Sequence, residues 1–564
     1  MLNRRNILLG AGAAAFGLSD ARALAQALTD PTIIKQRQSL GGDLAVLNAR
    51  IWTLDPARPR AQAALVRAGR VVAVGSNAEV LGQAGRVRRF DAGGRTVVPG
   101  FIDAHCHVEL AAPMYSGLEV SVHTPPLTSL EEIFGRLRER AAKTPEGRWI
   151  VARGGFGMKR QVKEQRWATR QELDAVSTRH PIIVLAGMHV AMMNTLGFER
   201  TGLLDIGHER ALRWKDGRAR RGTDLPRDAD GMPTGVVSEI FDIIPADIHT
   251  REERKQALAS QVVPVFTSKG ITSVGTMPMT NEERQVDQEL QQEGKLPMRI
   301  RTFPIVPFHT TVESLVQNGL VTGLGDDMYK FGGIKIYVGG GSVDVNGQPM
   351  NDLKYDQEAL TETLWRAHDG DIQAIMHQSS RHSYEITLRA AEAAIARKPV
   401  NMRHRLEHAA PRELQDVEQI RRMRRLGLRL AITGPTTRAT APRSGAPRYA
   451  TMAREGLQPF TVSDATGTTP VFSPLAAIAG ISAPQSEGGM LPPQEALNLE
   501  DALRSYTVWA AAAQFEEQDK GWIRPGNLGD FAVLDADLER VRGGALFDAK
   551  VDATILGGRV VYER

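Results

Sequence analysis

The sequence has little cysteine, no long apolar run in its body and little excess charge. Cys106 is its one cysteine, so no intrachain disulfide can form and a small disulfide-stapled fold is excluded. Beyond the N-terminal region, no stretch has the roughly eighteen consecutive apolar residues that a transmembrane helix needs. The formal charge is +5, with Lys and Arg scattered rather than clustered, which gives no electrostatic case for nucleic acid as a partner.

The proportions of apolar and charged residues are those of a soluble globular protein. Hydrophobic residues make up 42% of the chain and charged residues 24%, which excludes a disordered or fibrous protein. A chain of 564 residues is too long for one ordinary core. We therefore expect two compact units, or one large barrel with a smaller partner.

Residues 1–25 have the order of a bacterial export signal. Arg4-Arg5 precede an apolar run of small residues from Ile7 to Leu18, and Ala23-Leu24-Ala25 forms a cleavage site. The paired arginines are typical of the twin-arginine route. We predict a periplasmic or secreted protein that leaves the membrane after signal cleavage. An ordinary Sec signal or an uncleaved anchor is the alternative.

Short β-rich runs occur near both ends of the remaining chain. Near the start they cover 43–51 and 63–75, and near the end they cover 530–535 and 553–562. Because the two ends have the same character, we expect residues 43–96 and 525–564 to form one small β-sandwich. The middle of the chain then folds as an insert between them.

Residues 97–524 alternate β-rich runs with helix-compatible stretches, which predicts a parallel sheet. Eight such strands fit a (β/α)₈ TIM-type barrel of the α/β class. An insertion at about residues 115–265 follows the first strand, is far longer than ordinary connections, and is expected to cover the active site. The predicted strands are 97–105, 270–276, 298–306, 332–338, 372–377, 403–408, 429–433 and 460–464.

The first candidate site is His105-Cys106-His107, at the end of the first predicted strand. Alternate residues of a strand point to the same side, so the two imidazoles face together and can chelate one metal ion. Cys106 then points toward the surrounding helices, and we expect a packed thiol rather than a ligand. A His-x-His pair is a weak signal alone, but the preceding apolar run delivers it to a strand end.

Further polar side chains fall on other predicted strands, most of them at the carboxyl ends, where such barrels build their active sites. Imidazole and carboxylate together suit a borderline divalent ion such as zinc, with one position left open for water. A bound metal lowers the pKa of that water, and a carboxylate can take its proton. Asp464 is the candidate base, because its strand neighbours the first strand around the closed barrel. The side chains are Lys335, His377, His408 and Asp464.

Three motifs resemble the amidohydrolase superfamily, and within it the YtcJ-like branch, amidohydrolase family 3. They are the segments Phe101–His107, Arg405–His408 and Val462–Ala465, and the likeness runs from about Leu44 to the C-terminus. The resemblance implies one or two divalent metal ions and makes Asp464 both a ligand and the general base. The ligands that it implies are His105, His107, His377, His408 and Asp464.

The resemblance gives Lys335 and His189 roles that remain open. Lys335 could be carboxylated and bridge two metals, since an unmodified lysine is cationic and a poor ligand; the alternative is a buried or substrate-facing ammonium. The segment Gly187–Asn194 is similar to one in which a family histidine reaches the substrate, so His189 is a candidate catalytic contact. The alternative for His189 is a satisfied histidine at a loop edge.

The chain departs from the family in two segments that line the pocket. Relatives tend to carry His-Ala-x-Gly-Asp after the fifth strand, where this chain has His377-Gln378-Ser379-Ser380-Arg381. The acid of a family Ala-Asp-Gly-Ser-like tail is missing from the segment Val338–Ser342. These departures concern the substrate and leave the metal-binding frame intact.

Most of the 13 histidines are not expected to be ligands. His404 shares a strand face with His408 but lies near the opposite end, where a packing role is expected. We expect the histidines of predicted loops and helices to be solvated: His123, His180, His208, His249 and His368.

The combined prediction is a metal-dependent hydrolase that uses metal-activated water on a carbon–nitrogen bond other than a peptide bond, an amide or cyclic amide. Asp464 would take a proton from the water and pass it to the leaving amine. Two alternatives remain: a metal-binding, non-hydrolytic regulatory or sensing relative, and a hydrolase of ester bonds with the same site. The expected partner is a small-molecule substrate, and association into a homo-oligomer stays open.

Overall fold

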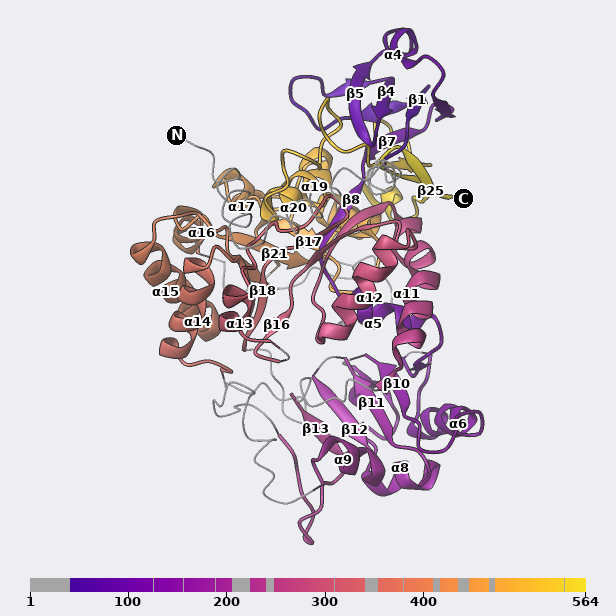
Figure 1. Ribbon diagram of the computed structural model, residues 1–564, viewed down its shortest axis with the longest axis vertical. Coiled ribbons are helices and arrows are strands. Elements are labelled where there is room, and N and C mark those ends of the chain that lie inside the picture. Colours follow the sequence, from indigo (N-terminus) through magenta and orange to yellow (C-terminus); the bar gives the residue numbers. More distant parts are fainter. Residues whose placement is uncertain are drawn as a thin grey trace, which may run out of the picture.

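A computed structural model describes most of the chain in three parts: a pair of small sheets, a barrel and an inserted sheet (Figure 1). The predicted export signal and His208 lie outside the described residues. The described residues are 41–124, 126–155, 157–187, 189–204, 224–239, 248–308, 310–339, 353–378, 380–408, 416–434, 446–465, 472–541 and 543–564.

Strands from both chain ends form the two small sheets at the top of Figure 1. The four-stranded sheet has the order β5-β4-β1-β6 and the six-stranded sheet has the order β25-β24-β23-β7-β2-β3. Buried side chains from both ends, such as Val46 and Ile555, share one core. The strands are β1 (Leu44–Leu47), β2 (Arg50–Trp52), β3 (Arg60–Ala61), β4 (Ala63–Arg67), β5 (Arg70–Gly75), β6 (Arg88–Asp91), β7 (Thr96–Pro99), β23 (Phe531–Leu534), β24 (Val551–Leu556) and β25 (Arg559–Glu563).

The middle of the chain forms the predicted parallel barrel. Its two hydrogen-bonded runs are β8-β14-β15-β17 and β16-β18-β19-β20-β21-β22, and β15 continues into β16 as β17 continues into β18. Backbone N–H groups of Asp464 and His107 donate to the carbonyls of His105 and Ala465, at 3.0 and 2.6 Å, and join the last strand to the first. The strands are β8 (Phe101–Cys106), β14 (Ile271–Thr276), β15 (Arg299–Thr302), β16 (Ile305–Val306), β17 (Tyr329–Phe331), β18 (Ile334–Gly339), β19 (Ala374–Gln378), β20 (Arg405–Glu407), β21 (Arg429–Thr433) and β22 (Phe460–Val462).

The first predicted barrel strand, 97–105, is divided between two sheets. β7 pairs antiparallel with β23 in the six-stranded sheet, and β8 pairs parallel with β14 in the barrel. Gly100 separates the two strands, and the backbone passes so close to Thr272 there that a Cβ would come within 2.3 Å of its side chain. The boundary between the small sheets and the barrel therefore lies at Gly100 rather than before Val97.

Residues between β8 and β14 form a sheet of their own, with the order β13-β12-β11-β10-β9. It lies below the barrel in Figure 1 and has separate apolar cores on its two faces. Helix α6 covers it and begins at a capping box, in which Ser129 and Glu132 satisfy each other's backbone N–H. The strands are β9 (Val120–Ser121), β10 (Ile150–Gly154), β11 (Ile182–Ala186), β12 (Val190–Met193) and β13 (Val236–Ser238).

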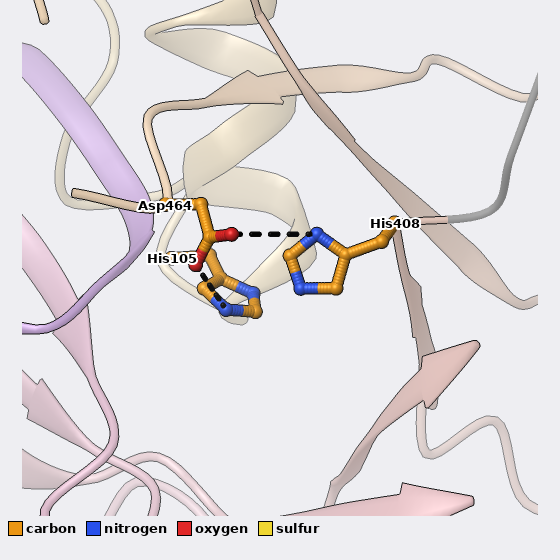
Figure 2. A group of neighbouring side chains, drawn as sticks. All are labelled: His105, His408 and Asp464. Atoms are coloured by element: carbon orange, nitrogen blue, oxygen red, sulfur yellow. Dashed lines mark ion pairs between the residues drawn. The ribbon is translucent and has the colours of Figure 1, made fainter. Parts of the chain in front are cut away.

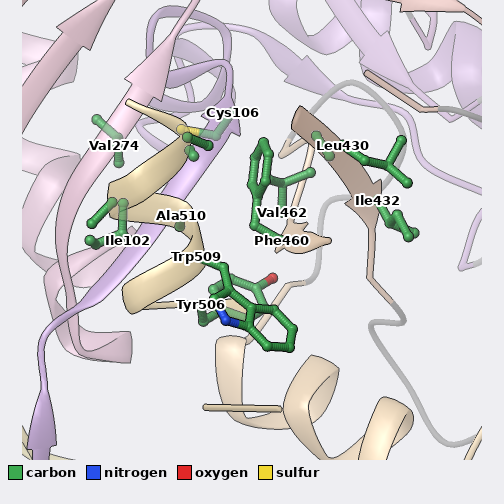
Figure 3. Close-up of a cluster of buried hydrophobic side chains, with 14 of the residues drawn as sticks. Ile102, Cys106, Val274, Leu430, Ile432, Phe460, Val462, Tyr506, Trp509 and Ala510 are labelled. Atoms are coloured by element: carbon green, nitrogen blue, oxygen red, sulfur yellow. The ribbon is translucent and has the colours of Figure 1, made fainter. Parts of the chain in front are cut away.

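Helices pack around the barrel and against the smaller sheets. Among the described residues, no helix is long and apolar enough to cross a membrane. The largest apolar core lies between barrel strands and helices (Figure 3). The helices are α4 (Asn77–Ala84), α5 (Val108–Tyr115), α6 (Leu130–Ala141), α7 (Met158–Gln161), α8 (Arg170–Val176), α9 (Thr195–Thr201), α11 (Arg251–Val265), α12 (Asn281–Gln292), α13 (Val312–Gln317), α14 (Gln357–Asp369), α15 (Arg381–Arg397), α16 (Val417–Arg425), α17 (Tyr449–Arg454), α18 (Pro474–Ser482), α19 (Leu499–Ser505) and α20 (Val508–Ala513).

Three histidines that were expected to be solvated are buried: His180, His249 and His368. Each has polar partners that remove the need for water. His180 Nε2 bonds the Thr144 carbonyl at 3.0 Å, and His249 Nε2 lies 3.3 Å from Glu119. His368 Nδ1 lies 2.9 Å from His404 Nε2. Polar partners supplied by distant segments, which sequence position does not reveal, make this burial possible.

Candidate metal centre

His105 is held by a buried carboxylate. It lies in β8, and its Nδ1 contacts Oε2 of Glu407. Arg405 fixes that carboxylate with two bonds, Nε to Oε1 at 2.8 Å and Nη2 to Oε2 at 3.0 Å. A carboxylate at Nδ1 places the imidazole proton there and leaves the Nε2 lone pair available to a metal.

Asp464 brings three histidines together at the carboxyl ends of the strands. Its Oδ1 lies 3.5 Å from His105 Nε2 and 3.3 Å from His107 Nε2, and its Oδ2 lies 3.9 Å from His408 Nδ1. Figure 2 shows Asp464 between His105 and His408. One possible ligand atom from each of His105, His408 and Asp464 lies within 4.8 Å of the other two, a spacing that one ion can span.

His377 and Lys335 border this group. The His377 ring centroid lies 4.7 Å from that of His408. Lys335 lies in the neighbouring strand β18. Burial is the largest cause that lowers the pKa of His105, His377 and His408, and the charge of Lys335 lowers it further. The fold thus places His105, His107, His408 and Asp464 together, with His377 beside them.

His408 and Asp464 reach the site through unusual backbone conformations. Their φ angles are +60° and +53°, in the left-handed region that non-glycine residues seldom adopt and that costs of order 1–3 kcal/mol each. In β20, Arg405 and Glu407 point into the barrel, while Leu406 joins the outer core and His404 bonds His368 of α14. His404 and His408 therefore do not share a face, because the left-handed turn redirects His408 inward.

Burial and neighbouring charges set the protonation states of the site. Burial lowers the pKa of His105 and His377 well below the ordinary value, and lowers that of His408 to about 4 although Asp464 opposes the shift. Burial alone would raise the pKa of Asp464, but His408, His107 and His105 lower it below its usual range. The imidazoles of His105, His377 and His408 are thus neutral and the Asp464 carboxylate is ionised, which are the forms that bind metals.

The donor set fits a divalent metal ion. His105 Nε2 and Lys335 Nζ are buried without a hydrogen-bond partner, although buried polar atoms nearly always have one. A cation next to neutral imidazole and carboxylate would satisfy the histidine, and the mixed nitrogen and oxygen donors suit zinc or a similar borderline ion. For Lys335, burial lowers the pKa to about 8 against the opposing effects of Glu407 and Asp464.

His189 comes to this site from the inserted sheet. It precedes β12, and its ring centroid lies 6.3 Å from that of His377. Tyr337 lies beside both: its ring stacks on His377 at 4.2 Å, and its hydroxyl lies 3.2 Å from His189 Nδ1. The predicted substrate contact therefore borders the ligand histidines without belonging to the three-residue group around Asp464.

Cys106 is buried away from these donors. Figure 3 shows it among apolar side chains that include Val274 and Ala510, as strand alternation predicts. Sequence reasoning missed the residues that support the site. Glu407 contacts His105 and is itself held by Arg405, and Tyr337 and Glu239 contact His189. Glu407 is part of the Arg405–His408 motif, but strand alternation predicts that it lies on the face opposite His408.

A parallel barrel with a cluster of histidines and an aspartate at its carboxyl end is typical of metal-dependent hydrolases. Residues 88–562 match the amidohydrolase family. The chain belongs to the amidohydrolase family and is therefore a hydrolase.

Individual relatives agree with this assignment over more than nine tenths of the chain. The N-substituted formamide deformylase of Arthrobacter pascens is 26% identical over 93% of this chain and 98% of its own length. The putative amidohydrolase YtcJ of Bacillus subtilis is 23% identical over 91% and 98%, which confirms the resemblance to the YtcJ-like branch.

Solved structures share the fold. A metal-dependent hydrolase from Pyrococcus horikoshii has a TM-score of 0.67 at 20% identity and covers 89% of this chain and 99% of its own. The atrazine chlorohydrolase of Arthrobacter aurescens, complexed with zinc, has a TM-score of 0.52 at 15% identity over 92% and 95%. The predicted barrel is thereby confirmed.

Proposed function

We propose that the protein hydrolyses carbon–nitrogen bonds of small amides, with zinc as its metal and N-substituted formamides as the first substrates to test. The observation that carries this is the convergence of His105, His408 and Asp464 within 4.8 Å at the strand ends. The deformylase relative, aligned over 98% of its length, supports the bond class. Cyclic amides remain within the proposal, and ester hydrolysis by the same site is the competing activity.

The residues divide into those that would hold the metal and those that move protons. His105, His107, His377, His408 and Asp464 would hold it, and Lys335 would join them if carboxylated, which would allow two ions. When bound, the metal supplies a Lewis acid that polarises the substrate carbonyl and makes water more acidic. The ionised Asp464 carboxylate accepts the proton of the attacking water and delivers it to the leaving nitrogen. Burial of the site excludes bulk water from these transfers.

Location and partners belong to the same proposal. The sequence of residues 1–25 supports export by the twin-arginine route, which carries folded proteins and would let the metal bind before export. The partner is then a small-molecule substrate met in the periplasm, with no membrane or nucleic acid, and subunit association is open. Fractionation of expressing bacteria should place activity in the periplasm, and an Arg4→Lys/Arg5→Lys variant should retain it in the cytoplasm.

The test is a panel of matched substrates with purified, zinc-loaded protein. Formate release from N-substituted formamides should be faster than hydrolysis of the corresponding formate esters and acetamides and than ring opening of cyclic amides. Turnover should stop with a chelator and return with zinc. Turnover of esters alone would establish the competing activity. No turnover of any amide by fully metallated protein would contradict the proposal.

A further inference from the structure

A buried chain of three charged or polar side chains links the inserted sheet to the barrel. Glu239 Oε1 lies 2.6 Å from His189 Nδ1, and Glu239 Oε2 lies 3.6 Å from Lys354 Nζ. The side chains of Glu239 and Lys354 are 1% and 2% exposed. Burying such charges is costly unless they are paired, so their pairing fixes where the inserted sheet meets the barrel.

The backbone places these side chains with little freedom. β12 and β13 pair antiparallel, with Val190 opposite Ser238, and the Glu239 N–H donates to the His189 carbonyl at 2.8 Å. Glu239 has a φ of +59°, which turns it at the end of β13. On the barrel side, the Lys354 N–H donates to the Val338 carbonyl at 3.0 Å, and Val338 lies in β18 together with Lys335 and Tyr337.

The carboxylate also determines which ring nitrogen of His189 carries the proton. A short contact between Nδ1 and Glu239 places the proton on Nδ1, and the Nε2 atom of the neutral ring is then an acceptor. The same carboxylate stabilises the ring after Nε2 takes a proton. His189 can then donate from Nε2 to a carbonyl oxygen or leaving nitrogen beside the ligand histidines.

We propose that Glu239 is a positioning residue for catalysis: it fixes the tautomer and orientation of His189 at the substrate, and Lys354 anchors Glu239 to the barrel. This inference rests on the proposed function for its effect on turnover. The inserted sheet is then part of the active site, because a substrate-contacting group depends on contacts between the two parts.

The chain contains a matched control within the same inserted segment. Glu119 is also a buried glutamate between a cation and a histidine: Arg153 Nε lies 2.6 Å from Oε2 and His249 Nε2 lies 3.3 Å from Oε1. None of these partners belongs to the proposed site. Substitution of Glu119 should therefore reproduce the structural cost of losing such a carboxylate without its catalytic effect.

The kinetic experiment compares Glu239→Gln with Glu119→Gln. Both variants should have a lower Tm, but Glu239→Gln alone should lower kcat, by about 10- to 100-fold as for other orienting carboxylates, with zinc content unchanged. Glu239→Asp should recover part of the rate. In a His189→Gln background, Glu239→Gln should add no further loss. Equal kcat for the two single variants, or a full additional loss in the double variant, would overturn the inference.

A second readout does not depend on turnover and separates this inference from the proposed function. In zinc-loaded protein with ¹⁵N-labelled histidine, the signals lost in His189→Gln identify His189. They should show the proton on Nδ1 in the wild-type protein and in Glu119→Gln, and a changed tautomer mixture in Glu239→Gln. A proton on Nε2 in the wild-type protein would overturn the inference even if every amide in the panel were hydrolysed.

Discussion

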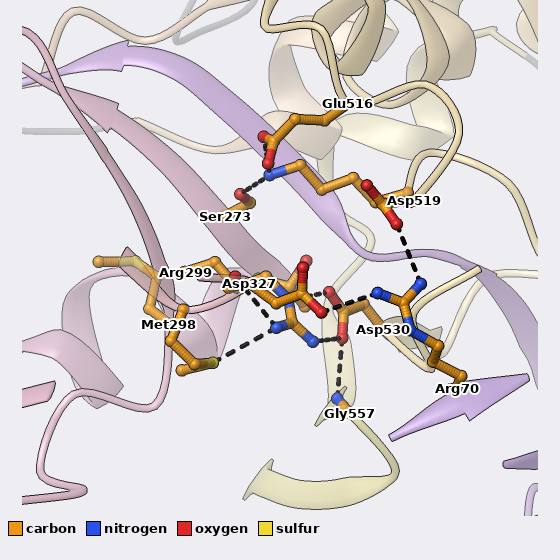
Figure 4. A network of polar contacts seen from close by, with 12 residues as sticks. Arg70, Ser273, Met298, Arg299, Asp327, Glu516, Asp519, Asp530 and Gly557 are labelled. Carbon is orange, nitrogen blue, oxygen red and sulfur yellow. Dashed lines mark hydrogen bonds and ion pairs between the residues drawn. The ribbon is translucent and has the colours of Figure 1, made fainter. Parts of the chain in front are cut away.

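The two ends of the barrel both bury charged side chains, but they use them differently. At the amino end, Arg299 makes a two-pronged ion pair with Asp530, from Nε to Oδ2 at 2.7 Å and from Nη2 to Oδ1 at 2.8 Å. Asp530 also accepts the Gly557 N–H at 2.8 Å, as Figure 4 shows. At the carboxyl end, His105 Nε2 and Lys335 Nζ lack a hydrogen-bond partner.

This difference separates a structural network from a binding site. The Arg299–Asp530 pair joins β15 to the sheet built from both chain ends, and its main polar atoms satisfy each other. At the carboxyl end, ligand atoms of His105, His408 and Asp464 lie within 4.8 Å of one another, an arrangement that a bound cation would satisfy. Barrels of this kind place stability at the amino end and chemistry at the carboxyl end.

Asp464→Asn, at the carboxyl end of the barrel, should have the largest effect on catalytic activity. Loss of the base should lower kcat/KM by about 10²- to 10⁴-fold. The Tm should change little, since asparagine tolerates the left-handed backbone better than most residues do. Steady-state kinetics and thermal denaturation of the same preparation measure both. Wild-type activity in this variant would remove Asp464 from the mechanism.

At the structural end, Asp530→Ala should show the opposite pattern. It leaves the Arg299 guanidinium buried and unpaired, which costs about 3–5 kcal/mol in the free energy of unfolding. kcat/KM of the folded protein should stay within about twofold of wild type. Urea denaturation measures the first quantity. Glu131→Ala serves as control, because it breaks only an exposed pair with Arg138 and should cost well under about 1 kcal/mol.

The smallest of the three predicted effects should come from Cys106→Ala, which tests whether the thiol is a ligand or a packed side chain. The thiol is buried in the apolar core, so its removal leaves a small cavity worth about 1 kcal/mol. Metal content should not change. If Cys106→Ala loses metal while keeping its fold, the thiol is a ligand and strand alternation fails at this position.

Sequence patterns predict the barrel and most of the site for a physical reason. Strand ends and apolar periodicity are local properties, and the carboxyl ends of parallel strands meet at one edge, so His105, His377 and Asp464 could be grouped without coordinates. The position of His408 was predicted but its geometry was not, because alternation assumes an extended backbone and φ is +60° there.

The supporting residues could not be predicted in the same way. Glu239 contacts His189 and Lys354, three residues from separate segments whose approach depends on how the inserted sheet packs. Glu407 contacts His105 although the two residues are 302 positions apart in the sequence. Such pairs are set by tertiary packing, and the chain provides no local pattern for them.

We infer that the carboxyl end of the barrel holds a divalent metal. Elemental analysis of the purified wild-type protein, of a His105→Ala/His408→Ala double variant and of Cys106→Ala measures the metal content. Wild type and Cys106→Ala should each carry one equivalent of zinc or a similar ion, or two if Lys335 is carboxylated, and the double variant should carry almost none. Wild-type protein that turns over substrate without metal, or a double variant that keeps a full equivalent, would contradict the claim.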